Sequence, residues 1–151
     1  MANTYSQIIL HIVFSVKKRE NLLKDEWRED LHKYITGIIR NRDQNLIIIN
    51  SVSDHLHLLI AVKPSIIVSN LIRDIKNNSS KFINKNDWVK GKFNWQKGFG
   101  IFSLGHSQIE MAKKYISRQK IHHIQRSFHE EYIKLLRRYK IEFNDKFVFD
   151  A

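Results

Sequence analysis

The sequence contains no cysteine, and this absence excludes two kinds of site. Disulfide bonds cannot form, and a metal ion would have to be held by nitrogen and oxygen donors. With one proline and five glycines, the chain should consist mainly of regular helices and strands. No stretch approaches the roughly 18 consecutive apolar residues of a membrane-spanning helix, and no cleavable signal segment is recognisable. We therefore expect a soluble, cytoplasmic protein that does not bind membranes.

Acidic residues are scarce relative to basic ones. Asp+Glu 15 against Lys+Arg 26 gives a formal net charge of +11, and the excess is concentrated between residues 63 and 140. A basic surface attracts polyanions and releases their condensed counterions on binding. Nucleic acid is therefore the first candidate partner, and a solvated basic surface without an anionic ligand is the alternative.

The length of 151 residues suits one domain with a single core, so we assign residues 1–151 to one domain. Apolar periodicity predicts strands at 5–16, 46–51, 55–62 and 100–104, and helices at 25–40, 67–84, 107–122 and 127–139. An extended tail is expected at 143–149. A capping box formed by Ser107 and Glu110 should open the third helix. This order predicts an α+β, ferredoxin-like split βαβ fold, with an antiparallel sheet, helices on one face and additional C-terminal helices.

Two histidines, His55 and His57, lie within the apolar run 46–62. On a strand, a spacing of two residues places both imidazoles on the same face of the sheet. Such a pair would supply two nitrogen ligands to one ion. Taken alone, the pair is a weak signal, because histidines with this spacing more often pack or face solvent.

Tyr115 and Gln119 lie one turn apart on the predicted helix 107–122 and should project from the same side. A tyrosine hydroxyl has a pKa of about 10, so it needs a metal or a base before it can attack phosphorus. Two histidines and one carboxamide would leave positions on Mg²⁺ or Mn²⁺ open for water or phosphate. The four residues indicate a metal-assisted tyrosine nucleophile. The alternative is that Tyr115 packs in the core and Gln119 faces solvent.

Several further residues have both a structural and a functional interpretation. We expect His11 to be a core histidine, although its strand could border the site. Asp54 could orient His55 or cap the hairpin turn, and His122 and His123 could cap a helix end or contact DNA. Aromatic residues that could pack in the core or stack on bases are Trp88, Phe93, Trp95 and Phe99. Basic residues that could follow phosphates or remain solvated are Lys113, Lys114, Arg118, Lys120 and Arg126.

In these residues the sequence resembles the single-tyrosine transposases of the HUH superfamily, small enzymes encoded by compact insertion sequences and their domesticated relatives. The resemblance extends over nearly the whole chain. It is carried by residues 11–15 with Lys18 and Arg19, residues 54–59, residues 93–100, and residues 115–119 with His122 and His123. The sequence departs from the family at Ser53, where many members have proline. This difference affects the geometry of the hairpin and lies outside the set of ligands.

The resemblance implies a DNA transposase that binds single-stranded DNA, often as hairpins near element ends. Such enzymes cleave and rejoin strands through a covalent 5′-phosphotyrosine. Tyr115 would be the nucleophile, and His55, His57 and Gln119 would hold Mg²⁺ or Mn²⁺. Members form homodimers in which the tyrosine helix of one subunit completes the site of the other.

The sequence is also compatible with two other functions. One is a non-catalytic nucleic-acid-binding module on the same scaffold, such as a repressor or a decayed relative. The other is a replication or conjugation nickase, which shares the chemistry but usually belongs to a longer chain.

Overall fold

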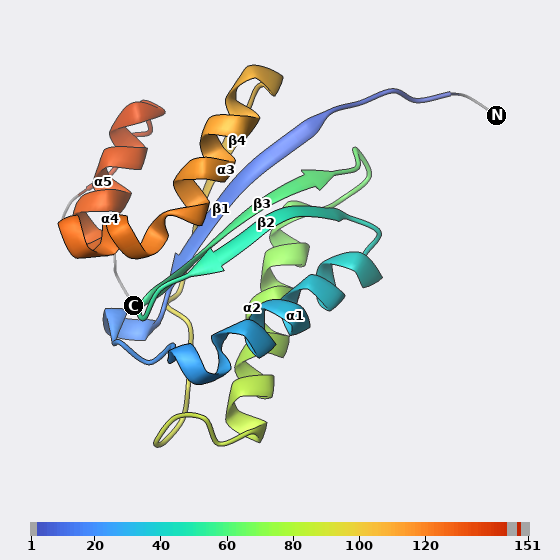
Figure 1. Cartoon of the computed structure of the whole chain (residues 1–151). Coiled ribbons are helices and arrows are strands. Elements are labelled where there is room, and N and C mark those ends of the chain that lie inside the picture. The colour runs from blue at the N-terminus through green and yellow to red at the C-terminus, as the bar shows by residue number, and fades with distance from the viewer. Residues whose placement is uncertain (1–2, 145–147, 149–151) are drawn as a thin grey trace.

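The sheet has four antiparallel strands in the order β2-β3-β1-β4, as Figure 1 shows. The structure is a computed structural model that describes residues 3–144 and residue 148, without the side chains of residues 122–124. The strands are β1 (Ile8–Ser15), β2 (Asn45–Ser51), β3 (His55–Val62) and β4 (Gly100–Leu104). Both pairs that involve β1 are antiparallel, with β3 on one side and β4 on the other. This arrangement confirms the predicted ferredoxin-like α+β fold.

Helices α1 (Asp25–Asn41) and α2 (Val68–Lys85) cover one face of the sheet. Alternate residues of the two central strands supply the apolar surface beneath them, because successive side chains of a strand point to opposite faces. The main core consequently contains Leu10, Ile12, Phe14, Leu56, Leu58 and Ile60 together with the buried stripes of both helices. This layer is the larger of the two and anchors the sheet.

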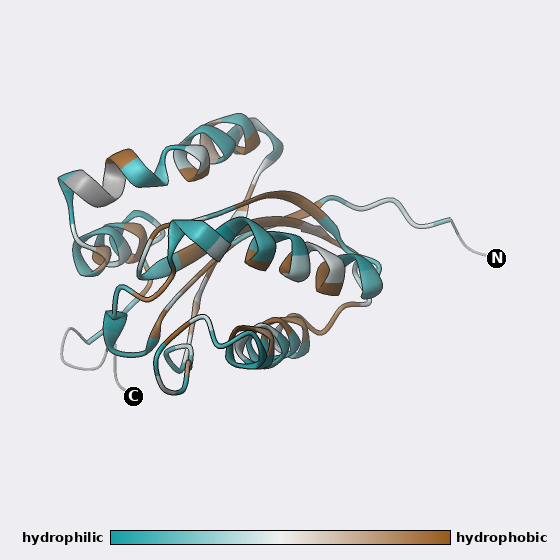
Figure 2. Cartoon of the chain, turned by 60° about the horizontal axis from the view of Figure 1, so that its bottom comes forward, coloured by the Kyte–Doolittle hydropathy of each residue, from teal (hydrophilic) through white to brown (hydrophobic). Residues whose placement is uncertain are grey.

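The C-terminal helices cover the opposite face of the sheet. They are α3 (Ile109–Ser117), α4 (Gln119–Gln125) and α5 (Phe128–Arg138). Ile9 and Leu59 pack with Ile116, and Val13 and Phe102 pack with Phe128. In Figure 2 the helix ribbons carry brown, apolar stretches on their sheet-facing sides and are mostly teal, polar, elsewhere. The sheet is therefore enclosed between two helical layers, with His55 and His57 on the C-terminal side.

The predicted helix over 107–122 is wrong in two respects. Ser107 does not cap it: a 3₁₀ turn, His106–Gln108, comes first, and the Gly105 amide donates to Gln108 Oε1 at 2.7 Å. The helix is also interrupted at Arg118, whose φ of −101° and ψ of 22° are not helical. Its amide closes the last turn of α3 by donating to the carbonyls of Lys114 and Tyr115. Tyr115 therefore lies near the end of α3, and Gln119 begins α4.

The remaining elements agree closely with the sequence. A second 3₁₀ turn, Lys17–Arg19, follows β1, and the β2–β3 connection closes with the Val52 amide donating to the His55 carbonyl. Ser127 caps α5 by accepting from the Glu130 amide. Most of the expected tail, 143–149, lies outside the described residues. In the part of the chain that is described, no helix is both long enough and apolar enough to cross a membrane.

Candidate functional site

Both histidines of β3 are completely buried on the face covered by the C-terminal helices. His55 opens the strand opposite Ser15, and His57 lies between Val13 of β1 and Asn50 of β2. Their ring centroids are 5.0 Å apart. Regular extended geometry thus brings the two imidazoles together, as their spacing in the sequence requires.

Glu131 of α5 joins the two histidines. Its Oε1 lies 2.8 Å from His57 Nε2 and 3.5 Å from His55 Nε2, and the side chain is buried. Sequence reasoning missed this residue. A signal was present, because Glu131 lies three residues after Phe128 and four before Leu135 and so interrupts the apolar stripe of its helix. A carboxylate at such a position is rarely buried without a partner.

Gln119 provides a second oxygen at the same place. Its Oε1 lies 3.0 Å from His55 Nε2, and the side chain is fully buried rather than solvated. Because Gln119 is the first residue of α4, the break at Arg118 helps to set its direction. The donor atoms of the cluster therefore come from β3, α4 and α5.

Each histidine is also held at its other ring nitrogen. His55 Nδ1 lies 2.7 Å from Asp54 Oδ1, and His57 Nδ1 lies 2.8 Å from His11 Nε2. Fixing one nitrogen sets the orientation of the ring and leaves Nε2 facing the cluster. Asp54 thus orients His55. From the sequence, this role and capping of the hairpin turn were both open. His11 is buried, as expected, and borders the site.

Tyr115 lies beside the cluster of its own chain. Its ring centroid is 5.9 Å from that of His57 and 6.3 Å from that of His11, in edge-to-face geometry. Burial raises the pKa of the Tyr115 hydroxyl above its ordinary value, and the negative charge of Glu131 and a hydrogen bond to it raise it further. The hydroxyl is therefore protonated at neutral pH and requires activation to become a nucleophile.

The charges within the cluster are strongly coupled. Burial opposes ionisation of Glu131, but hydrogen bonds to His55 and His57 outweigh it and lower the pKa of the carboxyl below its usual range. Burial also disfavours the charged form of His55, yet hydrogen bonds to Asp54 and Glu131 raise its pKa to about 9. Burial lowers the pKa of His57. The cluster thus combines an ionised carboxylate, one protonated imidazole and one neutral imidazole.

The cluster fits a divalent cation. One donor atom each from His55, His57 and Glu131 lie within 4.8 Å of one another. Glu131 Oε2 is buried and has no hydrogen-bond partner among the described residues, which is unusual for a carboxylate oxygen. An ion bound to this group would satisfy that oxygen and replace the proton on His55. The carboxylate and amide oxygens suit Mg²⁺ or Mn²⁺, and the imidazoles suit divalent transition metals.

The other residues singled out in the sequence lie in varied places. Phe93 and Trp95 are core residues, Trp88 stacks on Trp27, and Phe99 is 39% exposed. Among the basic residues near the tyrosine, Lys114, Arg118 and Lys120 are exposed, and Lys113 and Arg126 are partly buried. The side chains of His122 and His123 lie outside the described part of the structure.

Comparison with protein families gives a match to the model described as "Transposase IS200 like" over residues 4–119. The chain belongs to the IS200-like transposase family. This membership confirms the resemblance drawn from the sequence and makes the protein a DNA-processing enzyme of the transposase class. The matched segment includes His55, His57, Tyr115 and Gln119, whereas Glu131 lies beyond it.

Solved structures of similar fold include two transposases. A candidate transposase from Deinococcus radiodurans R1 has a TM-score of 0.64 and 17% identity, with coverage of 79% of this chain and 95% of that one. A REP-associated tyrosine transposase bound to a REP hairpin has a TM-score of 0.62 and 16% identity, with coverage of 82% and 73%. At such identities the likeness concerns the fold. Among curated proteins, none matches this sequence.

Proposed function

We propose that this IS200-like transposase cleaves and rejoins single-stranded DNA through a covalent 5′-phosphotyrosine at Tyr115. The observation that carries the proposal is the position of Tyr115 against His57, next to a buried cluster that suits a divalent cation. The solved relative bound to a REP hairpin supports hairpin-containing single-stranded DNA as the substrate. The formal net charge of +11 favours such a polyanion.

We further propose that His55, His57 and Glu131 hold Mg²⁺ or Mn²⁺, with the Gln119 amide oxygen as an additional ligand. When bound, the ion would supply positive charge that polarises the scissile phosphodiester. Asp54 and His11 keep the two imidazoles oriented, so that both Nε2 atoms face the same point. Burial of the cluster excludes bulk water, which favours transfer of the strand over hydrolysis.

The covalent step forms one bond to phosphorus and breaks another. The Tyr115 hydroxyl loses its proton, and its oxygen attacks the phosphorus, so a phosphotyrosine bond forms. The bond from phosphorus to the 3′ oxygen breaks, and the 3′ oxygen leaves as a hydroxyl after taking a proton. Because one phosphodiester replaces another, the step is reversible, and a second 3′ hydroxyl can release the tyrosine and join the strands.

The decisive experiment looks for the covalent intermediate. The protein is incubated with Mn²⁺ and single-stranded oligonucleotides that carry hairpins, and a denaturant-resistant adduct is resolved on a gel. Wild type should form the adduct and Tyr115→Phe should not, whereas Tyr5→Phe, at a tyrosine that is 89% exposed, should behave as wild type. Binding without an adduct across a broad oligonucleotide set would favour the non-catalytic alternative.

The contacts of Tyr115 with its own chain lead us to propose that it acts within its own subunit. A mixture of Tyr115→Phe and His57→Ala proteins distinguishes this from exchange of tyrosine helices in a homodimer. Each variant alone should form no adduct, and the mixture should also form none. Recovery of the adduct in the mixture would instead show that tyrosine and histidines from different subunits combine, as in the dimer that the family resemblance implies.

A further inference from the structure

A basic groove lies on the side of the sheet opposite to the histidines, between α2 and residues 94–99. We call it the α2 groove; it encloses about 360 Å³. Arg73 and Lys76 of α2 and Lys97 of the facing segment line it, and no acidic side chain is among the lining residues. Asp74, the acidic residue next to Arg73, is paired with Arg42. The groove thus contains three basic side chains, of which Arg73 and Lys97 are exposed, and no acidic one.

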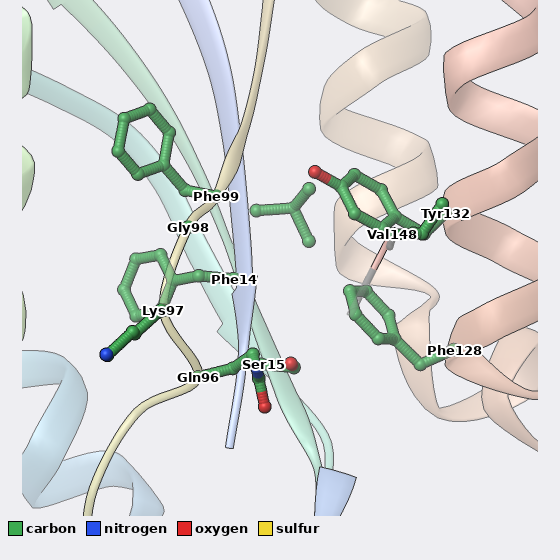
Figure 3. Close-up of a pocket in the computed structure, with 10 residues that line it drawn as sticks. Phe14, Ser15, Gln96, Lys97, Gly98, Phe99, Phe128, Tyr132 and Val148 are labelled. Atoms are coloured by element: carbon green, nitrogen blue, oxygen red, sulfur yellow. The ribbon is translucent and has the colours of Figure 1, made fainter. Parts of the chain in front are cut away.

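The segment 94–99 has a defined shape. Lys76 Nζ donates to the carbonyls of Gln96 at 2.6 Å and Gly98 at 2.8 Å. Gly98 adopts a φ of 83°, which a residue without Cβ reaches without strain. Lys97 and Phe99 are exposed, and Figure 3 shows their side chains extending to the side of the segment away from α5. A cation and an aromatic ring are therefore presented together at the groove.

The same segment borders a pocket on the histidine side of the sheet. This pocket encloses about 270 Å³ and is lined by residues 96–99, by Ser15 of β1, and by Phe128 and Tyr132 of α5. In Figure 3 the two α5 rings face the segment across the pocket. Phe128 also stacks on His55, with ring centroids 4.3 Å apart. Residues 96–99 line both this pocket and the α2 groove, so a path from Phe128, beside the cluster, to the α2 groove runs through the pocket.

We propose that the unpaired DNA next to the cleavage position follows this path and that its sugar–phosphate backbone binds in the α2 groove. The inference rests on the proposed function and assigns a binding site for the substrate strand. Arg73 and Lys97 would contact phosphates, which are the anions that complement an all-cationic groove. Phe99 would stack on an unpaired base, as exposed aromatic residues do in grooves that bind single strands.

Affinities of hairpin oligonucleotides with long, short or absent single-stranded flanks test the proposal. All measurements use a Tyr115→Phe background, so that the DNA stays intact. Arg73→Ala combined with Lys97→Ala should weaken binding of the long-flank DNA about tenfold and make its salt dependence less steep by about 0.7 per lost phosphate contact. Phe99→Ala should weaken it by about fivefold or more. Lys81→Ala, an exposed lysine on the same helix outside the groove, is the control.

The flank series separates the possible outcomes. Losses confined to oligonucleotides that carry a single-stranded flank would support the path. Equal losses on hairpins without flanks, or equal losses in Lys81→Ala, would overturn it. If wild type forms the Tyr115 adduct while the groove variants bind every oligonucleotide normally, the groove proposal fails and the proposed chemistry stands. All of the substituted groove residues are exposed, so their variants should fold.

Discussion

His55 and His57 each use one ring nitrogen for orientation and present the other to the cluster. Asp54 and His11 supply the orienting contacts, at 2.7 Å and 2.8 Å. The arrangement resolves a problem of burial, because an imidazole in an apolar layer must satisfy both nitrogens. Glu131 lies 2.8 Å from Nε2 of His57, and Gln119 lies 3.0 Å from Nε2 of His55. The same contacts that stabilise the fold therefore assemble the candidate metal ligands.

Glu131→Gln tests the residue that sequence reasoning missed. The amide keeps the shape of the side chain but removes its negative charge, so Mn²⁺ affinity measured by calorimetry should fall at least tenfold. Losses of this size are typical even of residues that only support a metal ligand. Glu130→Gln, an exposed neighbour on the same helix, should bind Mn²⁺ as wild type does. Equal affinity in both variants would remove Glu131 from the proposed ligand set.

His32, outside the site, should contribute to acid sensitivity. Burial and the nearby charge of Arg28 lower its pKa from 6.5 to about 4, and its Nε2 lies 2.7 Å from Ser51 Oγ. Between pH 6.5 and 4 the unfolded chain binds a proton here that the folded chain does not. The free energy of unfolding should therefore fall as the pH decreases through this window.

His32→Gln, which can retain a hydrogen bond to Ser51, provides the measurement. Urea unfolding at several pH values should show a smaller loss of stability between pH 6.5 and 4 in the variant than in wild type. Above pH 7 the two proteins should have the same pH dependence, because His32 is neutral in both states. Parallel profiles through the acidic window would show that His32 does not titrate as described.

The break between α3 and α4 is stabilised by a contact with strand β2. Asn50 of β2 donates to the carbonyl of Ile116 at 2.8 Å, next to the position where the helix ends. The Ile116 carbonyl accepts this hydrogen bond from the sheet, so it does not require a backbone amide from a further helical turn. This contact holds the end of α3, and with it Tyr115, against the strand that pairs with His57. The tyrosine is thereby positioned by the sheet as well as by its own helix.

Gly100 of β4 sets the distance between the sheet and α5. A Cβ at this position would lie 2.7 Å from Tyr132 Cε1 and 3.1 Å from Val13 Cγ1. Gly100→Ala should therefore displace α5 and lower the free energy of unfolding by about 1–3 kcal/mol. Gly37→Ala, in α1 with no atom within 4 Å of the new Cβ, should raise it by about 0.5–1 kcal/mol. Denaturant unfolding measures both, and a neutral Gly100→Ala would contradict the close approach.

The distribution of charge over the molecule predicts how DNA binding responds to salt. Exposed basic residues lie in the α2 groove and at the ends of α3 and α4. Affinity for a single-stranded oligonucleotide should fall steeply with increasing salt, because each neutralised phosphate contributes about −0.7 to the slope of log K against log salt concentration. Fluorescence anisotropy at several salt concentrations measures the slope. A flat response would support a merely solvated basic surface.

Local patterns in the sequence were sufficient for much of this architecture. The two-residue spacing of His55 and His57 placed both rings on one face, because strand geometry depends on adjacent residues. Apolar periodicity located α1, α2, α5 and every strand to within a few residues. The absence of cysteine limited any metal site to nitrogen and oxygen donors. Each of these inferences concerns residues that are close together in the chain.

Which residues form the cluster is decided by contacts between segments that are distant in the sequence. Glu131 meets His57 across 74 positions in the sequence, and His57 meets His11 across 46. The periodicity of α5 identifies a buried carboxylate but cannot say which strand residues lie opposite it. Likewise, the break at Arg118 depends on packing against the sheet, which a helical pattern does not record. Secondary structure is governed by neighbours in the chain, whereas a site assembled from β3, α4 and α5 exists only once those elements pack together.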